Sequence, residues 1–240
     1  MGKAIHRYGL IQEGDRILVG VSGGKDSLSL FHLLHERSKR VPIHYELFPV
    51  YIDLGFDSGR AEILKKYFET KGLPYAIEFT DIGRRANSAE NRENPCFLCS
   101  WERRKRLFHL AHRLKCSKIA LGHHKDDIIE TLLLNIFFSA EISTMIPFQN
   151  LFNGKITLIR PFALIEEKKI ERFAQEMGLP FGPSGCPTSG KTKRKVVKDI
   201  IDSLSKKNRK VKGNIFRALS NVKLDYTLIP RSHSKENENV

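Results

Sequence analysis

The sequence predicts an α/β fold in which a parallel sheet carries helices on both faces. Strand-like apolar segments alternate with helix-like segments, and three separate polar patches follow the ends of predicted strands. Strands that are separated by helices form parallel βαβ units, and ligands of such sheets bind beyond the carboxyl ends of the strands. With 240 residues, of which 40% are hydrophobic and 28% charged, the chain can bury the core of one such domain.

The first half of the chain supplies three of the expected strands. The apolar run LSLFHLL after the first strand has helical spacing, so a helix follows the glycine-rich turn there. The expected elements are a helix at 3–10, a strand at 16–21, the helix after the turn, a strand at 44–53, an amphipathic helix at 58–70, a strand at 74–79, an aperiodic polar segment at 81–95 and a helix at 97–113.

The second half continues the alternation and then changes in composition. A helix at 166–177 is stopped by Gly178 and Pro180. Before it we expect a strand at 118–122, an almost wholly apolar helix at 127–138 and a strand at 156–161. From Lys191 the chain becomes basic and polar. We therefore expect one domain over 1–204 that carries the cysteines, and a basic, partly mobile tail over 205–240.

The most informative segment is the turn Ser22-Gly23-Gly24-Lys25-Asp26-Ser27 between the first strand and its helix. Its two glycines permit close approach of the backbone to a ligand, and the N-terminus of a helix attracts anions. Lys25 adds a positive charge and the serines add hydroxyl donors. The spacing is neither that of the Walker loop nor that of the dinucleotide fingerprint. The turn predicts a phosphate-binding loop of another kind.

Four cysteines provide a second candidate site. Cys96 and Cys99 open the helix at 97–113, and Cys186 follows between Gly185 and Pro187. Thiolates at a helix N-terminus have lowered pKa values, and this spacing lets both sulfurs face one metal. Three ligands are compatible with zinc, with a redox thiol pair or with a [4Fe–4S] cluster that has one open iron. We assign Cys116, just before a predicted strand, to core packing.

The formal net charge of +14 indicates a nucleic-acid partner. Residues 191–212 contain ten Lys or Arg against two Asp, which suits contact with RNA phosphates. The first residues lack the apolar core of a signal peptide, and the apolar stretches are too short to span a membrane. We therefore expect a cytoplasmic protein.

Taken together, SGGKDS, the segment from Pro95 to Phe138 and LIRPF resemble the TtcA family, the tRNA 2-thiocytidine synthetases among the PP-loop ATPases. The resemblance runs from about residue 17 to about residue 199. It implies a Rossmann-like, adenine nucleotide alpha hydrolase-like fold and an enzyme that adenylates a base carbonyl with ATP and replaces the oxygen with sulfur. The implied substrate is cytidine 32 of the tRNA anticodon loop. Members of the family carry the third cysteine in a further Cys-x-x-Cys, whereas this chain has SGCPTSG.

The resemblance also implies cofactors, partners and site residues. ATP would bind Ser22, Gly23, Gly24, Lys25, Asp26, Ser27, Asp53 and Gly122. The catalytic set would be Lys25, Asp26, Arg103, Asp126 and Asp127. Of the pair Asp126 and Asp127, at least one would support Mg²⁺ or the activated base. The alternative role of this pair is to cap the N-terminus of the helix that follows. Cys96, Cys99 and Cys186 would hold the [4Fe–4S] cluster. Partners would be tRNA and a sulfur donor such as a cysteine desulfurase or free sulfide, and the assembly could be a homodimer.

Several further interpretations stay open at this level. His123 and His124 are read as pocket lining, and Trp101 and Phe97 could stack on a base or pack in the core. A 2-thiouridine-forming thiolase would need cysteine-rich zinc modules that are absent from this chain. A lysidine-forming ligase would not need the three cysteines. A zinc-stapled RNA-binding protein without catalysis would not need an intact SGGKDS and the aspartates.

Overall fold

The protein, in a computed structural model, is described for residues 1–56, 59–183, 185–188, 190 and 192–226. In these residues six strands form one sheet in the order β3-β2-β1-β4-β6-β5, and all neighbours are parallel except β5 with β6. The strands are β1 (Asp15–Val21), β2 (Tyr45–Asp53), β3 (Ala76–Phe79), β4 (Lys118–Ala120), β5 (Phe148–Leu151) and β6 (Ile156–Ile159). The predicted parallel sheet is confirmed. The antiparallel edge strand β5 was not predicted, because the strand is only four residues long and its sequence FQNL contains no apolar run.

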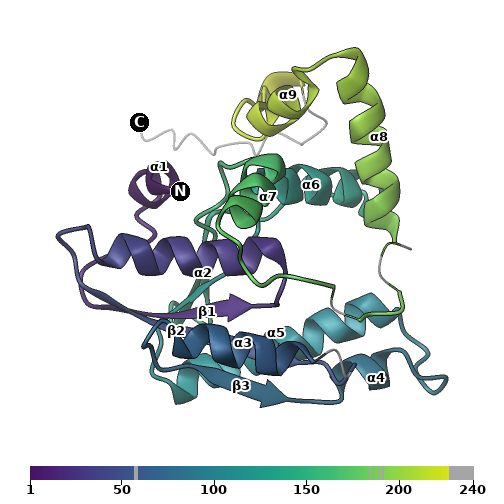
Figure 1. The fold of residues 1–240 in the computed structure, drawn as a ribbon. Helices are drawn as coiled ribbons and strands as arrows, with labels where there is room; N and C mark the ends of the chain where they lie inside the picture. The colour runs from purple at the N-terminus through teal and green to yellow at the C-terminus, as the bar shows by residue number, and fades with distance from the viewer. Residues whose placement is uncertain (57–58, 184, 189, 191, 227–240) are drawn as a thin grey trace, which may run out of the picture.

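The helices are α1 (Gly2–Arg7), α2 (Lys25–Ser38), α3 (Arg60–Glu69), α4 (Ile82–Ala86), α5 (Pro95–Arg113), α6 (Lys125–Ser139), α7 (Glu167–Glu176), α8 (Lys193–Lys207) and α9 (Val211–Ala218). In Figure 1, α2 and α7 lie together on one side of the sheet, while α8 and α9 stand beyond α6 and α7. No helix of the described residues is long and apolar enough to cross a membrane.

The sheet is buried on both faces, as helices on two sides require. Ile17, Val19 and Val21 of β1 pack with α1, α2, α3 and α7, whereas Leu18 packs with α4 and α5 on the opposite face. This alternation follows from the two-residue period of a strand. The segment 81–95, expected to be aperiodic, contains the short helix α4, whose Ile82 and Ala86 are buried. The helix was not predicted, because it is only five residues long and too short to produce a helical period of apolar residues.

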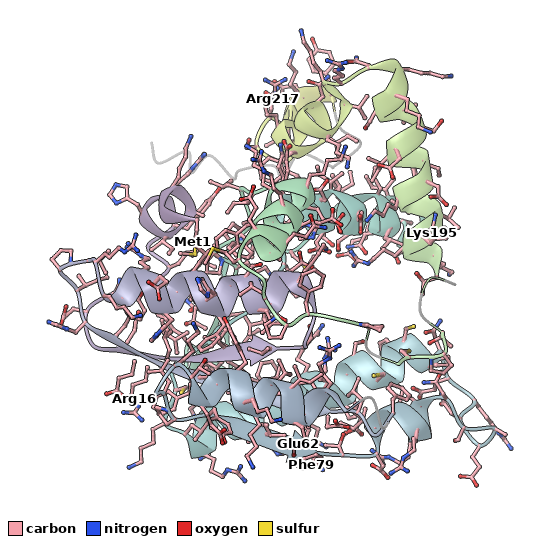
Figure 2. All side chains as sticks on the ribbon, in the orientation of Figure 1. Met1, Arg16, Glu62, Phe79, Lys195 and Arg217 are labelled. Carbon is pink, nitrogen blue, oxygen red and sulfur yellow. The ribbon has the colours of Figure 1, made fainter. Side chains whose placement is uncertain are left out.

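A third, smaller core joins the basic C-terminal segment to the domain. Val197 and Ile201 of α8 are buried against Ile129 of α6, and α9 packs on both helices. Figure 2 shows Lys195 on α8 and Arg217 on α9 at the outer side of this unit. The described part of the expected tail, 205–226, thus includes the end of α8 and all of α9, whereas residues 227–240 lie outside the described residues.

This small core predicts a sharp difference between two adjacent isoleucines of α8. Ile201 is 3% exposed and Ile200 is 39% exposed. Ile201→Ala should lower the free energy of unfolding by about 2 kcal/mol or more and speed amide exchange in α8, because it removes buried methyl groups. Ile200→Ala should change the unfolding free energy by less than about 0.5 kcal/mol. Equal effects in denaturant unfolding would contradict the packing of α8 on α6.

Candidate functional site

The phosphate-binding loop is held in shape by its own serines. The backbone N–H of Ser22 donates to Ser27 Oγ at 3.0 Å, and Ser27 Oγ donates to the carbonyl of Gly24 at 3.0 Å. Gly24 is the N-cap residue of α2, and Gly23 has φ +80°, where glycine is favoured. The first N–H groups of α2 have no acceptor within the helix. The loop therefore presents backbone donors at the carboxyl end of β1, as the sequence predicted.

The loop meets the segment that leads to Cys186. The backbone N–H of Gly182 donates to the carbonyl of Gly23 at 3.2 Å. Arg60 of α3 lies beside both glycines and donates from Nη1 to the carbonyl of Pro180 at 2.8 Å. A Cβ on Gly182 would stand 1.9 Å from Arg60 Nη2, and a Cβ on Gly23 would stand 2.9 Å from Arg60 Cδ. Arg60 and the two glycines thus fasten this segment to the phosphate loop.

A cavity of about 380 Å³ opens beside the loop. Its lining comes from the ends of β1 and β2, from α5 and from the 180s segment, and includes Ser22, Gly24, Asp53, Arg103 and Gly182. This volume is in the range of small-molecule sites. Three sequence-predicted groups, the loop, Asp53 and Arg103, therefore face one cavity.

Asp53 and Gly122 have local roles that the structure makes explicit. Asp53 Oδ1 accepts from the N–H of Gly55 at 2.7 Å, which fixes the turn after β2. A Cβ on Gly122 would lie 3.0 Å from the backbone of Asp26 and Ser27, so a larger residue would push the β4 end and the loop apart. The direct role of Gly122 in nucleotide binding stays a prediction.

A chain of ion pairs runs from the phosphate loop to the C-terminal helices. Glu167 at the start of α7 accepts from Lys25 at 2.9 Å and from Lys198 of α8 at 2.8 Å. Burial opposes ionisation of Glu167, but these two lysines outweigh it and lower its pKa to about 2. For Lys25, burial acts to lower the pKa, and Glu167 together with Asp26 outweighs it and raises the pKa.

The two aspartates predicted at the start of α6 differ in environment. The side chain of Asp126 is 7% exposed, accepts from Lys212 of α9 at 2.9 Å and accepts from the N–H of Glu167 at 2.8 Å. Burial opposes its ionisation, but these donors lower its pKa. Asp127 forms a capping box with His124, from whose N–H it accepts at 3.0 Å. It also lines a second cavity, of about 260 Å³.

The second cavity lies beside the C-terminal part of the phosphate loop, at Asp26. Asp26, His124, Asp127 and Glu167 line it together with Arg194 of α8. Burial raises the pKa of Asp26, against the lowering effect of Lys25. Of the two α6 aspartates, Asp127 faces the open space, whereas Asp126 is engaged by Lys212 and Glu167. His124 lines this cavity and is also the buried N-cap of α6, and burial lowers the pKa of His123 to about 4.

The three predicted cluster cysteines come together although 90 residues separate two of them in sequence. Cys96 Sγ lies 3.8 Å and Cys186 Sγ 3.3 Å from the hydroxyl of Thr188, so these two sulfurs are at most about 7 Å apart. Burial raises the pKa of Cys99, the charge of Arg103 lowers it, and the neighbouring Cys186 and Cys96 raise it. Cys116 is 4% exposed in the core, as predicted, and burial raises its pKa to about 11.

Asn94 positions the first two cysteines. Its side chain accepts from the N–H groups of Cys96 and Phe97 at 3.0 and 3.2 Å, and Pro95 occupies the first helical position. The helix therefore starts at Pro95, two residues before the predicted start, and Cys96 lies in its first turn. Within the described residues no three His, Cys, Asp or Glu side chains are placed to hold a single metal ion.

Several site residues were missed in the sequence, namely Arg60, Thr188, Glu167, Arg194, Lys198 and Lys212. Arg194 donates to Glu130 at 3.0 Å and to Asp127 at 3.4 Å. The acidic start of the helix at 166–177 was one available signal for Glu167, and the basic run after residue 191 was another for the three C-terminal cations. Nothing local marks Arg60, whose partners are 120 residues away.

Comparison with known proteins agrees with this geometry. A family described as the PP-loop domain matches residues 3–204. The tRNA-cytidine(32) 2-sulfurtransferase of Geobacter sulfurreducens is 39% identical over 95% of this chain and 90% of its own length. The protein of that name from Geotalea uraniireducens is 40% identical over 95% and 92%. The chain belongs to the tRNA-cytidine(32) 2-sulfurtransferase family of PP-loop proteins.

A solved structure supports the fold of this family member. The U34-tRNA thiolase NcsA from Methanococcus maripaludis, solved with its [4Fe–4S] cluster, superposes with a TM-score of 0.74 at 26% identity. The match covers 91% of this chain and 76% of that protein. The predicted PP-loop fold and family are thereby confirmed. The PP-loop implies the use of ATP.

The ion chain gives this family member a distinct pH dependence of stability. The pKa of Glu167 falls from 4.5 to about 2 on folding, so its contribution to stability is full above pH 4.5 and is lost as the pH falls toward 2. Glu167→Gln should therefore be less stable than the wild type near neutral pH, with the difference shrinking through that window in urea unfolding. Glu176→Gln, at an exposed site of the same helix, should show no such trend. A pH-independent difference for Glu167→Gln would argue against the ion chain.

Proposed function

We propose that this protein is an ATP-dependent tRNA thiolase that converts cytidine 32 of the anticodon loop to 2-thiocytidine. The relatives at about 40% identity are named for this reaction. The carbonyl oxygen at C2 attacks the α-phosphate of ATP and pyrophosphate leaves. Sulfide then attacks C2, and AMP leaves with the original oxygen. The balanced reaction therefore needs a nucleotide site and a sulfur site within reach of one base.

One observation carries this proposal. The Gly182–Gly23 hydrogen bond joins the phosphate loop to the segment that brings Cys186 to Cys96 and Cys99. Arg103 lines the nucleotide cavity, and its charge also acts on the Cys99 thiol, whose pKa is raised by burial in spite of it. A base that reaches Arg103 thus has the loop on one side and the cysteines on the other.

The arrangement of the three cysteines is compatible with a [4Fe–4S] cluster. Thiolates on one zinc lie about 3.8 Å apart, an estimate from the 2.3 Å zinc–sulfur bond and tetrahedral geometry. Thiolates on a [4Fe–4S] cluster lie about 6–7 Å apart. The limit of about 7 Å between Cys96 and Cys186, with a hydroxyl between them, leaves room for the wider arrangement. When bound, such a cluster supplies an open iron that can carry the sulfur to be transferred.

The chain's own residues prepare this site. Cys96 lies in the first turn of α5, and burial raises the pKa of Cys99 against the lowering effect of the nearby Arg103 charge. Ser22–Ser27 would hold the phosphates of ATP with backbone N–H groups, and Asp53 would border the nucleoside. Lys25 would exchange Glu167 for a phosphate oxygen. Arg103 would offset negative charge on the α-phosphate as the base oxygen attacks it.

Asp26 and Asp127 are the candidates to support Mg²⁺, which offsets charge on departing pyrophosphate. Both line the second cavity, next to the loop. Asp126 would act as a positioning residue through Lys212 and Glu167. The sulfur donor, a desulfurase or free sulfide, the homodimer and the boundary at residue 204 stay predictions.

The nucleotide half of the reaction is tested at Lys25. Lys25→Ala should reduce tRNA-dependent release of AMP and pyrophosphate by at least about 100-fold, because phosphate charge loses its nearest cation. Lys39→Ala, at an exposed site near the end of the same helix, should leave it unchanged. Circular dichroism should show both variants folded. Undiminished AMP release from Lys25→Ala would remove the assigned role of the loop.

The sulfur half is tested by metal analysis and nucleoside mass spectrometry. Anaerobically purified protein should contain roughly four irons per chain. Cys96→Ser, Cys99→Ser or Cys186→Ser should lose most of the iron and all 2-thiocytidine formation, whereas Cys116→Ser should keep the iron. Stoichiometric zinc without iron would instead support a structural metal, and 2-thiouridine in place of 2-thiocytidine would change the substrate base.

A further inference from the structure

We propose that the outer face of α5 is a binding surface for the single-stranded RNA around the target nucleotide. The surface consists of Phe97, Trp101, Lys105, Phe108 and His112 and is called the α5 outer stripe below. The proposal rests on the proposed function, because it assigns a surface to the RNA of that reaction.

The stripe is continuous because of its spacing. Its members follow one another at four, four, three and four residues, which places them on one side of a helix with 3.6 residues per turn. Arg103, Leu107 and Leu110 occupy the opposite side, toward the nucleotide cavity and the core. One helix therefore presents one face to the chemistry and the other to the exterior.

The aromatic members of the stripe are not used by the core. Phe97 is 62% exposed and Trp101 is 48% exposed, which decides against the core-packing interpretation of both. The ammonium group of Lys105 lies 5.2 Å from the centre of the Trp101 ring. A flat aromatic face beside a cation is the arrangement on which unstacked bases pack in single-stranded RNA complexes.

The far end of the stripe forms a groove with the turn between β5 and β6. Phe108 and Phe152 pack edge to face with ring centres 5.1 Å apart. With Lys105, His109 and His112 they line a hollow of about 470 Å³. A neighbouring hollow of about 340 Å³ adds Lys115 and Lys155 to its lining.

The charge of this region suits RNA. Helix α5 contains five Arg or Lys and a single acidic residue, Glu102, and neither hollow is lined by a carboxylate. A protein partner would gain from an uninterrupted apolar patch, whereas here Lys105 interrupts the row of aromatic rings. Phosphates would contact the lysines, and bases would stack on the rings.

The stripe is also correctly placed relative to the chemistry. It begins in the helical turn that carries Cys96 and Cys99 and runs along a helix of about 28 Å, the length of 19 residues. A strand of several nucleotides laid along it would end at the cysteines. The target base would then turn past the helix end into the cavity that Arg103 lines.

The chain contains a built-in probe for this contact, because Trp101 is its single tryptophan. Titration with an RNA hairpin that carries the anticodon loop should quench the tryptophan fluorescence of the holoprotein. By anisotropy of labelled hairpin, Trp101→Ala and Lys105→Ala should each weaken binding about tenfold, the loss expected for one stacked base or one phosphate contact. The matched controls are Phe79→Ala, at an exposed site on β3 that is labelled in Figure 2, and Lys65→Ala, at an exposed site on α3. Both should bind as the wild type.

The outcomes separate this surface from the function on which it rests. Loss of hairpin binding in Trp101→Ala with unchanged iron content and unchanged ATP binding supports the stripe. Full hairpin binding and 2-thiocytidine formation by both α5 variants, without fluorescence quenching in the wild type, overturns the stripe and leaves the function intact; the face would then serve a protein partner. Absence of 2-thiocytidine formation by the wild type itself rejects the proposed function instead.

Discussion

The backbone contact between Gly182 and Gly23 is the constraint on which the arrangement of the site depends. It brings the segment before Cys186 against the phosphate loop, at a distance of 3.2 Å between donor and acceptor. A larger residue at either glycine would have to displace the Arg60 side chain, which lies beside both of them. Arg60 is 8% exposed and bonded to the carbonyl of Pro180, so it fixes the segment from the other side. The position of the phosphate loop and the position of Cys186 therefore depend on the same backbone contact.

The second organising feature is electrostatic and connects the loop to the C-terminal helices. Lys25 and Lys198 share the carboxylate of Glu167, and Lys212 holds Asp126. The side chains of Glu167 and Asp126 are 24% and 7% exposed, so solvent screens these pairs less than it screens surface pairs. Helices α8 and α9 thus contribute cations to the edge of the sheet that carries the phosphate loop, as well as basic groups to the surface. A displacement of α8 would change the position of Glu167, and thereby the ion pair that Glu167 forms with Lys25 of the phosphate loop.

Helix α5 serves several requirements at once. Its N-terminus carries two cysteines, its inner side supplies Arg103 and its outer side exposes aromatic and basic groups. One helix can do this because successive residues project in different directions around its axis. A change in the start of the helix would rotate all three sets together. Asn94 and Pro95 at its start therefore help to place the cysteines.

The sequence by itself determined the alternation of strands and helices, the phosphate loop, the three cysteines and the packing role of Cys116. These features are local, since each is expressed in apolar periodicity, in glycine positions or in residue type over a few neighbours. Only the tertiary structure decided that Asp127 faces a cavity while Asp126 is held by Lys212, and that Arg60 joins segments 120 residues apart. It also decided that β5 closes the sheet antiparallel and that α8 and α9 pack on α6. These outcomes depend on contacts between segments that are distant in sequence, and the local periodicity of a sequence carries no information about such contacts.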